Sequence, residues 1–487
     1  MNLSIPSRQE YLLLSKKYDL IPVCREINAD MDTPISIFKK ISPRGPAYLL
    51  ESVEGGESLA RYSFIGFDPF LNFTSKGEES RISGGGGSKV VSGSPLENLA
   101  KLISGFHVYN GEELPRFFGG AVGYLGYGAV RFFERINISR KNIPDLPDSN
   151  FIFAGTVLIF DHVKHSLKIV INSFPGENPE SSYDNVEYRF QKVIESINRT
   201  VALEYGNPGH GAFAPVETNM TRENFIKQVE RAKEYIKAGD ILQVVLSQRF
   251  RTPFQGEPFN VYRRLRALNP SPYLYYLDFG TAQVVGSSPE MLVRVVGDTA
   301  ETCPIAGTRP RGKNLEADRR MAEELLEDAK ERAEHLMLVD LGRNDLGKVC
   351  EPGSIKVSRF MEIERFSHVM HLVSNVKGRM SSGRDSSDAL RACFPAGTVT
   401  GAPKVRAMEI IDELEPDGRG VYAGAIGYFG FTGNLDTAIA IRTVIIREGN
   451  AYVQAGAGIV ADSDPEREYE ETINKARALL NTIGEAG

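Results

Sequence analysis

The sequence predicts an α+β fold, and two observations carry this prediction. Short runs rich in β-branched and aromatic residues, bounded by Gly, Pro, Asp or Ser, are typical of strands, and longer stretches repeat apolar residues at the helical period. The two kinds of segment do not alternate in the regular order of a parallel βαβ protein. With 487 residues, of which 41% are hydrophobic, the chain is long enough for two or three domains with substantial cores.

The first third of the chain is predicted to consist mainly of strands. A short helical stretch covers residues 9–18, and strand-like runs follow at 47–52, 61–67, 155–160 and 166–171. The glycine-rich run 117–127 invites comparison with a phosphate-binding loop. It has no G-x-G-x-x-G pattern that leads into a helix with a ribose-binding acid, so we favour close packing of strands.

A domain boundary is predicted where a helical pattern ends. Apolar residues follow the helical period from 181 to 203, and Gly and Pro then interrupt the pattern from 204 to 215. The sequence therefore predicts an N-terminal domain of residues 1–215 and a larger domain of residues 216–487. The larger domain should begin with a helix over 222–237, because Thr221 suits the N-cap and Gly239 suits the position after the last turn.

The larger domain mixes strands and helices. Strand-and-turn units are expected at 241–250, 269–276, 283–290 and 302–312, followed by a helical stretch over 315–341 and an apolar run over 365–374. A loop over 395–404 leads into a helix over 405–414. Strands at 421–428, 436–444 and 451–460 precede a last helix, for which Ser463 is the expected cap and Asp464 and Glu466 complement the helix dipole.

Composition excludes several classes of protein. The net charge of −6 and the pI of about 5.8 argue against a nucleic-acid binder. No apolar run approaches the ~20 residues that cross a bilayer, and the N-terminus lacks the basic-then-apolar order of a signal peptide. The four cysteines are scattered without metal-ligand spacing. These features predict a cytoplasmic protein with reduced cysteines.

Two pairs of carboxylates suggest a metal site. Glu331 and Glu334 lie three residues apart, so both point to the same side of a helix, and Glu468 and Glu471 repeat this spacing. If the two helices face each other, four carboxylates converge, which is tolerable only with a cation between them. Oxygen ligands suggest Mg²⁺. The ordinary alternative is a solvated helix face whose acids pair with neighbouring Lys and Arg.

Five long segments stand out in the second half of the chain: Pro304-Ile-Ala-Gly-Thr-Arg-Pro-Arg-Gly312, Ala333-Glu-His-Leu-Met-Leu-Val-Asp-Leu-Gly-Arg-Asn-Asp345, Ser367-His-Val-Met-His371, Pro395-Ala-Gly-Thr-Val-Thr-Gly-Ala-Pro-Lys404 and Gly456-Ala-Gly-Ile-Val-Ala-Asp-Ser-Asp464. In the same order along the chain, they resemble segments of the chorismate-utilising enzymes, most strongly the large subunits of anthranilate synthases. The resemblance spans roughly residues 221–476. It implies an anthranilate synthase-type fold, in which helices surround an orthogonal antiparallel β-sandwich. Interleaved N- and C-terminal segments would be compatible with that fold.

The resemblance implies a Mg²⁺-dependent reaction. Ammonia attacks C2 of chorismate, the C4 hydroxyl leaves, and elimination of pyruvate then gives anthranilate. Glu334 and Glu471 would bind Mg²⁺ directly, while Glu331 and Glu468 would hold its water ligands. The metal would in turn hold the ring carboxylate of chorismate.

The resemblance also implies a set of substrate contacts. Arg442 can offer a bidentate fork to the second carboxylate of chorismate, and glycines let backbone N–H groups approach an anion closely. Outside this context a strand arginine is usually an ion-pair partner and a glycine a turn residue. The complete expected set is Gly307, Thr308, Tyr422, Arg442, Gly456, Ala457, Gly458 and Lys475.

Two further residues are expected to take part in catalysis. His371 lies in an apolar run, where a lone histidine is usually a buried structural residue. Its match to the active-site histidine of the family reverses that preference, and a near-neutral pKa suits it for proton transfer. Thr398, at a Gly-Thr turn, could hydrogen-bond near the leaving group.

Two positions distinguish between related reactions. Isochorismate and salicylate synthases carry a water-activating lysine where this chain has Gln243, and aminodeoxychorismate synthases carry a nucleophilic lysine where this chain has Ala306. With neither lysine present, direct attack by ammonia is favoured over these alternatives. A non-catalytic subunit that binds chorismate or an amino acid is a further alternative, against which the complete set of acidic and basic groups argues.

Two partners are expected. The chain has no glutaminase arrangement of Cys, His and Glu, so a separate glutaminase subunit should supply ammonia. Two short segments, Leu49-Leu-Glu-Ser52 and Asn269-Pro-Ser-Pro-Tyr273, resemble the tryptophan-binding elements of the family, which predicts feedback inhibition by tryptophan. Alternatively, Glu51 and Ser52 merely end a strand. The expected inhibitor contacts are Glu51, Ser52, Pro272, Tyr273 and Leu274.

Overall fold

Two long, bent strands join the two sheets of the protein. The computed structural model describes residues 4–52, 61–136, 138, 146–200, 215–366 and 369–484. Strands β3 (Tyr62–Lys76) and β7 (Ser149–Asp161) pair antiparallel, with a register shift between Pro69 and Leu71. Before the shift β3 also pairs with β2, and after it with β4. Strands that change sheet at a bulge form the corners of an orthogonal β-sandwich.

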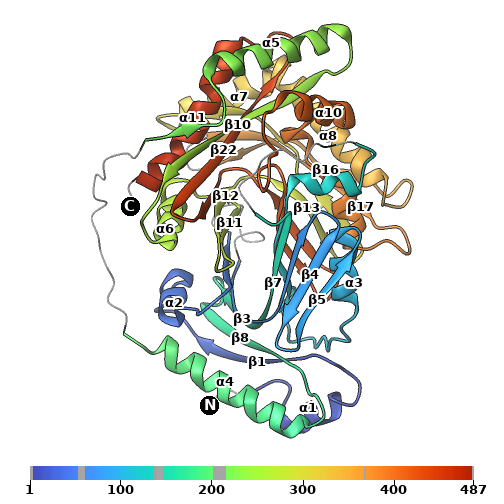
Figure 1. Cartoon of the computed structure of the whole chain (residues 1–487), viewed down its shortest axis with the longest axis vertical. Helices are drawn as coiled ribbons and strands as arrows, with labels where there is room; N and C mark the ends of the chain where they lie inside the picture. The colour runs from blue at the N-terminus through green and yellow to red at the C-terminus, as the bar shows by residue number, and fades with distance from the viewer. Residues whose placement is uncertain are drawn as a thin grey trace.

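The first sheet contains the start of β3 and the end of β7 (Figure 1). Its pairings are antiparallel and follow the order β1 (Ile21–Asn28), β8 (Ser166–Ser173), β7, β3, β2 (Ala47–Glu51), β11 (Tyr273–Asp278), β12 (Gln283–Ser288), β21 (Thr443–Arg447), β22 (Asn450–Ile459) and β10 (Gln243–Pro253), with β9 (Glu217–Thr218) and β18 (Gly401–Ala402) beside β10.

The second sheet contains the other halves of the same two strands. Its antiparallel order is β5 (Gly87–Ser92), β4 (Glu79–Gly84), β3, β7, β6 (Gly120–Leu125), β19 (Ala425–Gly430), β20 (Leu435–Ile439), β13 (Met291–Val296), β14 (Thr299–Thr302) and β17 (Val369–Arg379), with β15 (Ile305–Pro310) and β16 (Lys356–Arg365) also paired to β17. The predicted α+β class and its antiparallel β-sandwich core are confirmed.

Alternation along the strands separates two cores. On β2, Tyr48 belongs to a cluster built from residues of both sheets, whereas Leu49 belongs to a cluster of this sheet with helices. Figure 1 shows helices at both ends of the sandwich. The helices that contribute to the second of these clusters are α1 (Arg8–Leu14), α2 (Pro34–Ile41), α4 (Pro179–Ile197), α6 (Pro258–Leu268) and α11 (Pro465–Gly484).

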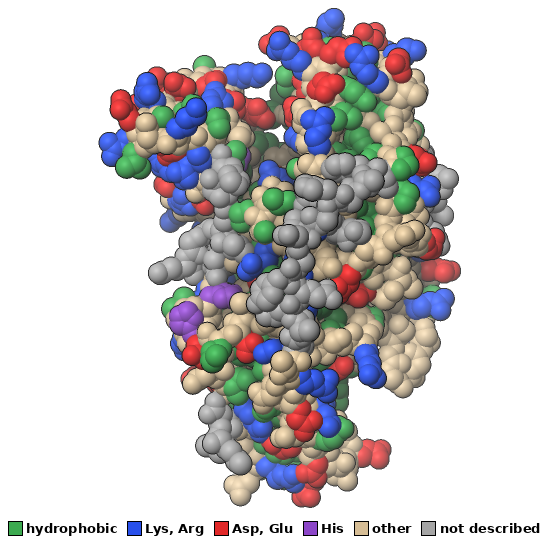
Figure 2. All heavy atoms as spheres, turned by 90° about the vertical axis from the view of Figure 1, so that its left-hand side faces the viewer, with side chains coloured by type: hydrophobic (Ala, Val, Ile, Leu, Met, Phe, Trp, Pro, Cys, Tyr) green, Lys and Arg blue, Asp and Glu red, His purple; other side chains and the backbone are tan. Residues whose placement is uncertain are grey.

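Other helices cover the rest of the sandwich. Helices α3 (Pro95–Ser104), α8 (Ala329–Gly347) and α9 (Ser386–Cys393) pack on the second sheet. Helices α5 (Arg222–Ala238) and α10 (Lys404–Leu414) pack on β10 and β22, and α7 (Leu315–Glu327) packs on β17. Two short 3₁₀ helices are η1 (Tyr127–Phe132) and η2 (Gly397–Val399). Figure 2 shows side chains of both charges crowded on two lobes at one end, with a hollow between the lobes.

Several local predictions are confirmed. Thr221 caps α5 by accepting from the Asn224 backbone N–H, and Gly239 follows the helix with φ 83°. The glycine-rich run contains β6, where a Cβ on Gly123 would lie 1.9 Å from the Asn150 carbonyl oxygen. Glycine is therefore required there by close strand packing, as the sequence predicts.

Two helix boundaries differ from the predictions. The helical stretch expected over 315–341 is two helices, because Asp328 leaves the helical conformation and its carboxylate caps α8 through the Lys330 and Glu331 N–H groups. The expected cap Ser463 is wrong for α11. Asp464 takes that place, since its carboxylate accepts from the Glu466 and Arg467 N–H groups at 3.0 Å.

The two parts of the chain share both sheets. Strand β2 pairs with β11, and β6 pairs with β19, so strands from either side of residue 215 are neighbours in each sheet. The segment of the predicted boundary lies outside the described residues apart from its last position. The division into domains 1–215 and 216–487 stays a prediction.

Candidate functional site

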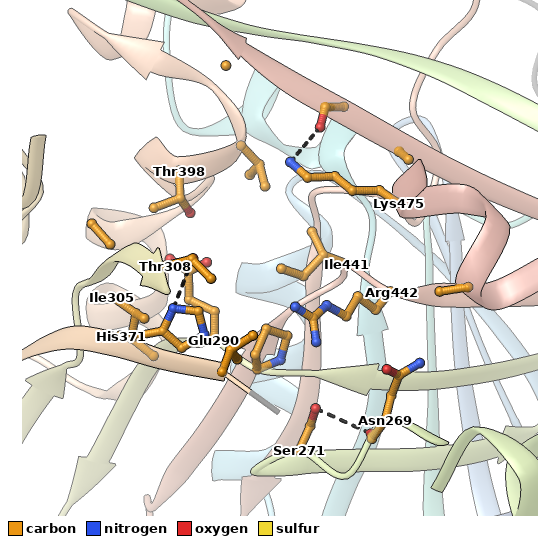
Figure 3. Close-up of a pocket in the computed structure, with 18 of the residues that line it drawn as sticks. Asn269, Ser271, Glu290, Ile305, Thr308, His371, Thr398, Ile441, Arg442 and Lys475 are labelled. Atoms are coloured by element: carbon orange, nitrogen blue, oxygen red, sulfur yellow. Dashed lines mark hydrogen bonds between the residues drawn. The ribbon is translucent and has the colours of Figure 1, made fainter. Parts of the chain in front are cut away.

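A cavity of about 560 Å³ gathers most of the residues expected to bind substrate (Figure 3). Its walls come from β15, β17 and β22, from the segment that joins β20 to β21, and from helices η2, α8 and α11. Ten of the residues expected to bind substrate or metal or to take part in catalysis line it: Gly307, Thr308, Glu334, His371, Thr398, Tyr422, Arg442, Gly456, Gly458 and Lys475. Ala457, between the two glycines, is fully buried in the cluster under α5 and α10.

Arg442 supplies a positive charge to the cavity. It lies just before β21 with φ 49°, a left-handed conformation that is strained for a residue with a side chain. The Ser287 backbone N–H donates to the Arg442 carbonyl at 3.1 Å and helps to hold this conformation. Figure 3 shows the guanidinium group directed into the cavity, where it can meet a carboxylate.

His371 is held in one orientation by β15. Its Nδ1 lies 2.9 Å from the Gly307 carbonyl oxygen and 3.1 Å from the Thr308 hydroxyl. A carbonyl only accepts, so Nδ1 carries the proton and Nε2 has a free lone pair in the neutral ring. Desolvation is the main cause that lowers the pKa of His371, and the Arg442 charge acts in the same direction. The neutral imidazole can therefore accept a proton near pH 7.

Two glycines on β22 make room for their neighbours. A Cβ on Gly456 would lie 2.7 Å from the Tyr422 hydroxyl oxygen, and a Cβ on Gly458 would lie 2.9 Å from Gln243 Nε2. Lys475 Nζ donates to the Gly456 carbonyl at 3.0 Å. Burial raises the pKa of Tyr422 to about 12, so its hydroxyl stays protonated and can donate.

Glu290 is a cavity residue that sequence reasoning missed. Burial raises its pKa to about 7, although the nearby Thr398 hydroxyl and the Arg442 charge oppose the rise. Thr398 Oγ1 is itself buried and completes no hydrogen bond of ordinary geometry within the described part of the chain. A carboxyl group with this pKa can donate a proton near neutral pH. The sequence signal that could have indicated this residue is an acid that follows a proline directly after strand β12, which ends in two buried serines.

The predicted metal ligands lie on α8 and α11. Desolvation raises the pKa of Glu334, and the Glu331 and Glu471 carboxylates add to this; the pKa of Glu468 is raised by desolvation and by Glu471. Within the described ranges, no three His, Cys, Asp or Glu side chains are gathered to hold a metal as they stand.

Basic side chains already contact two of these acids. Lys475 Nζ lies 2.6 Å from Glu471 Oε1, and Arg309 Nη1 lies 3.1 Å from Glu331 Oε1. Glu334 faces the cavity, whereas Glu471 and Lys475 line an adjoining surface hollow. Carboxylates that repel one another beside a cavity are a donor set that fits a hard divalent cation such as Mg²⁺.

The two positions that distinguish related reactions carry neutral side chains. Ala306 lines the cavity next to the irregular pairing of β15 with β17. Gln243 begins β10, with its amide beside Gly458. Neither side chain can act as a base or as an amine nucleophile.

A second, smaller cavity of about 110 Å³ contains all five expected inhibitor contacts, namely Glu51, Ser52, Pro272, Tyr273 and Leu274. The Tyr273 hydroxyl donates to Asp436 at 2.9 Å, and Arg294 Nε lies 2.9 Å from the same carboxylate. The Glu51 side chain is already bound by Tyr262 and Arg266. An ammonium group here would therefore rely on the remaining polar groups of the lining.

The antiparallel sandwich and its charged, glycine-lined cavity define the class of the protein: an α+β enzyme whose substrates are small anionic molecules. A family model described as chorismate binding enzyme matches residues 45–481. The chain belongs to this family, and within it to the group of relatives named anthranilate synthase component 1. None of the helices among the described residues is long and apolar enough to span a membrane.

The relatives match along nearly the whole chain. The anthranilate synthase component 1 of Acetivibrio thermocellus is 50% identical, covering 99% of both chains, and that of Aquifex aeolicus is 48% identical, covering 99% of this chain and 98% of its own. The crystal structure of anthranilate synthase component I from Streptococcus pneumoniae is 41% identical with a TM-score of 0.79, and the match covers 88% of this chain and 93% of that chain. A menaquinone-specific isochorismate synthase from Escherichia coli, 19% identical with a TM-score of 0.71, shares the fold, and that match covers 98% of each chain.

Proposed function

We propose that this enzyme converts chorismate and ammonia to anthranilate and pyruvate with the help of Mg²⁺. The observation that carries the proposal is the cavity itself, whose lining includes two cationic side chains, Arg442 and Lys475, and the carboxylate of Glu334. Chorismate has two carboxylates, so it needs two separate positive partners. The names of the full-length relatives support the same reaction.

The two carboxylates of the substrate would be held differently. The guanidinium of Arg442 and the backbone N–H groups beside Gly456 and Gly458 suit the carboxylate on the enolpyruvyl arm. Mg²⁺ bound to Glu334 and Glu471, with Glu331 and Glu468 holding its water ligands, would supply charge stabilisation for the ring carboxylate. The Tyr422 hydroxyl, which stays protonated, can donate to a substrate oxygen.

Two groups are suited to the proton transfers. Glu290, protonated near neutral pH, can donate to the C4 hydroxyl as it leaves as water. Nε2 of His371 can accept the proton from C2 when the enolpyruvyl C–O bond breaks and the ring becomes aromatic; the released enolpyruvate takes up a proton to become pyruvate. The Thr398 hydroxyl, next to Glu290, can hydrogen-bond to the departing oxygen.

Ammonia is favoured as the nucleophile because the side chains at positions 243 and 306 are neutral and cannot take part in the alternative reactions. Ala306 cannot form a covalent bond to C2, as the lysine of aminodeoxychorismate synthases would, and the Gln243 amide cannot activate water for isochorismate or salicylate formation. A non-catalytic binding subunit would have no use for a carboxyl group whose pKa is about 7 inside the cavity. Ammonia at C2 is the reaction that these residues support best.

Two partners complete the proposal: a protein that supplies ammonia and a small molecule that inhibits the enzyme. The name component 1 of the relatives implies a second component, and a glutaminase subunit that delivers ammonia fills that place. Tryptophan bound in the smaller cavity would inhibit the reaction, provided that it binds one conformation of the enzyme better than another. The five residues gathered there support this site.

Product identification tests the proposal. The purified chain, given chorismate, ammonium salt and Mg²⁺, should form anthranilate and pyruvate in equal amounts. With glutamine in place of ammonium, the chain alone should form neither. Aminodeoxychorismate, isochorismate or salicylate as the product would reject the proposed reaction, and turnover with glutamine alone would reject the need for a glutaminase partner.

A further inference from the structure

A buried ion pair lies behind the catalytic cavity. Arg419 and Glu415 are 4% and 3% exposed, and the carboxylate accepts from Arg419 Nη2 at 2.6 Å and from Nε at 2.9 Å. None of the proposed catalytic steps uses this pair. Burying two charges is costly, and apolar residues of similar volume are often as stable or more stable at such a position. Stability alone therefore gives a weak reason for the pair.

The remaining hydrogen bonds of Arg419 go to backbone groups of the cavity wall. Its Nη1 donates to the Val399 carbonyl at 2.6 Å, and its Nη2 donates to the Val245 carbonyl at 2.7 Å. Val399 and Val245 both line the cavity, and Val399 follows Thr398 in the same short 3₁₀ helix, η2. One guanidinium group thus fixes two segments, from β10 and η2, relative to each other.

The same pair supports two further cavity residues. The Arg419 guanidinium lies 5.5 Å from the ring centre of Tyr422, and the Tyr422 backbone N–H donates to the Arg419 carbonyl at 3.2 Å. Glu415 accepts from the Ser247 N–H and hydroxyl, both at 2.8 Å, and Gln454 Nε2 donates to that hydroxyl at 2.9 Å. Tyr422 and Gln454 both line the cavity.

We propose that Arg419 and Glu415 are positioning residues, which fix Thr398 and Tyr422 in the geometry that the reaction needs. The inference rests on the proposed function. Neither residue touches the cavity, so each acts through the groups it holds. A displacement of about 1 Å in such groups can lower a rate by about 100-fold, whereas substrate capture by Arg442 and Lys475 would remain.

The double variant R419M/E415L separates positioning from stability. It replaces the pair by apolar side chains of similar length, which removes the cost of burying two charges but also the hydrogen bonds to Val399, Val245 and Ser247. The unfolding midpoint, measured beside kcat, reports the net effect on stability. The kcat for anthranilate formation should fall about 10- to 100-fold, with a smaller change in KM for chorismate. The conservative variant R419K keeps the charge but reaches fewer carbonyls, and it should retain an intermediate kcat.

A neighbouring ion pair provides a matched control. Arg249, on the same strand as Val245, pairs with Asp417, with side-chain exposures of 14% and 20%, and neither residue lines the catalytic cavity. R249M/D417L should change kcat by less than about twofold, since these side chains hydrogen-bond each other, Asn219 and the Gly418 carbonyl, and none of these residues lines the catalytic cavity. A double variant R419M/E415L that folds and keeps the wild-type kcat overturns the inference.

Two further measurements keep the test decisive. If R419M/E415L does not fold, R419K and S247A must lower kcat by more than the control pair does, and wild-type kcat in both overturns the inference. A crystal structure of a folded variant must show Thr398 and Tyr422 displaced. If the wild-type enzyme forms no anthranilate, the proposed function is rejected. In that case the crystal structure still tests the positioning role, which is rejected if Thr398 and Tyr422 have not moved in the variant.

Discussion

Pro272 and Tyr273 are consecutive residues, yet they serve the two cavities differently. Pro272 lines both the catalytic cavity and the smaller cavity, whereas Tyr273 lines the smaller one and donates to Asp436 at 2.9 Å. The preceding residues Asn269 and Ser271 line the catalytic cavity. A ligand that moves Tyr273 would therefore move a wall of the catalytic cavity through one peptide bond.

Blocking the smaller cavity should remove feedback without removing catalysis. S52F places a ring in this cavity, so tryptophan binding by calorimetry should weaken by more than about 100-fold, while kcat without tryptophan stays within about twofold. S92F, at the end of the peripheral strand β5, is the control and should bind tryptophan normally. Normal inhibition of S52F would place the inhibitor elsewhere.

The pKa of Glu290 predicts the alkaline limb of the pH profile. Because the carboxyl must be protonated to donate, kcat/KM should fall as the pH rises through about 7. E290Q should lose both this limb and most of the activity. A limb that persists unchanged in E290Q would belong to another group.

The same carboxyl predicts a pH-dependent stability. The pKa of Glu290 is raised from 4.5 to about 7 in the folded state. The stability that the protonated carboxyl contributes to the folded state is therefore complete below pH 4.5 and is lost as the pH rises through 7. In that window the free energy of unfolding should fall by up to about 1.4 kcal/mol per pH unit. Denaturant titrations should show this slope for the wild type and a smaller slope for E290Q.

His371 predicts the acidic limb. Its pKa lies below 6.5 because of desolvation, so kcat/KM should decrease only below that pH as the imidazole takes a proton. H371Q should lower kcat about 100-fold or more and abolish the limb. H107Q serves as the control, since the His107 side chain is 78% exposed and outside the cavity, and it should keep the wild-type profile.

The carboxylates of α8 predict the metal dependence. E334Q should raise the Mg²⁺ concentration for half-maximal activity by more than about tenfold, and calorimetry with Mg²⁺ alone should show the same weakening. E327Q changes an exposed acid of α7 and should bind Mg²⁺ normally. Equal Mg²⁺ affinity in the wild type and E334Q would remove Glu334 from the metal site.

Gly456 predicts a purely steric effect. In G456A the new Cβ would lie 2.7 Å from the Tyr422 hydroxyl oxygen and 2.9 Å from the Leu246 carbonyl oxygen, so the tyrosine or the strand must shift. KM for chorismate should rise about tenfold or more. G85A, where a Cβ meets nothing within 4 Å, should have no effect on KM.

Sequence patterns predicted the strands and the caps of α5, because periodicity and capping residues report local geometry. The residues of the cavity were expected from the resemblance of five long segments to a known family. The sequence patterns missed Glu290, since its importance comes from burial beside Thr398 and Arg442, which are distant in sequence. They also missed the break at Asp328, because the apolar pattern continues across it. Arg419 and Glu415 gave no signal, because an acid and a base four residues apart usually form an exposed ion pair.

The shared strands β3 and β7 have a consequence for folding. Each sheet contains half of both strands, and each sheet also combines strands from the two ends of the chain. Neither sheet can therefore melt without disrupting the pairing of β3 with β7, which continues into the other sheet. Despite its length, the described sandwich should lose its structure in one cooperative transition, and a fragment cut near residue 215 would leave both sheets with exposed, unpaired strand edges.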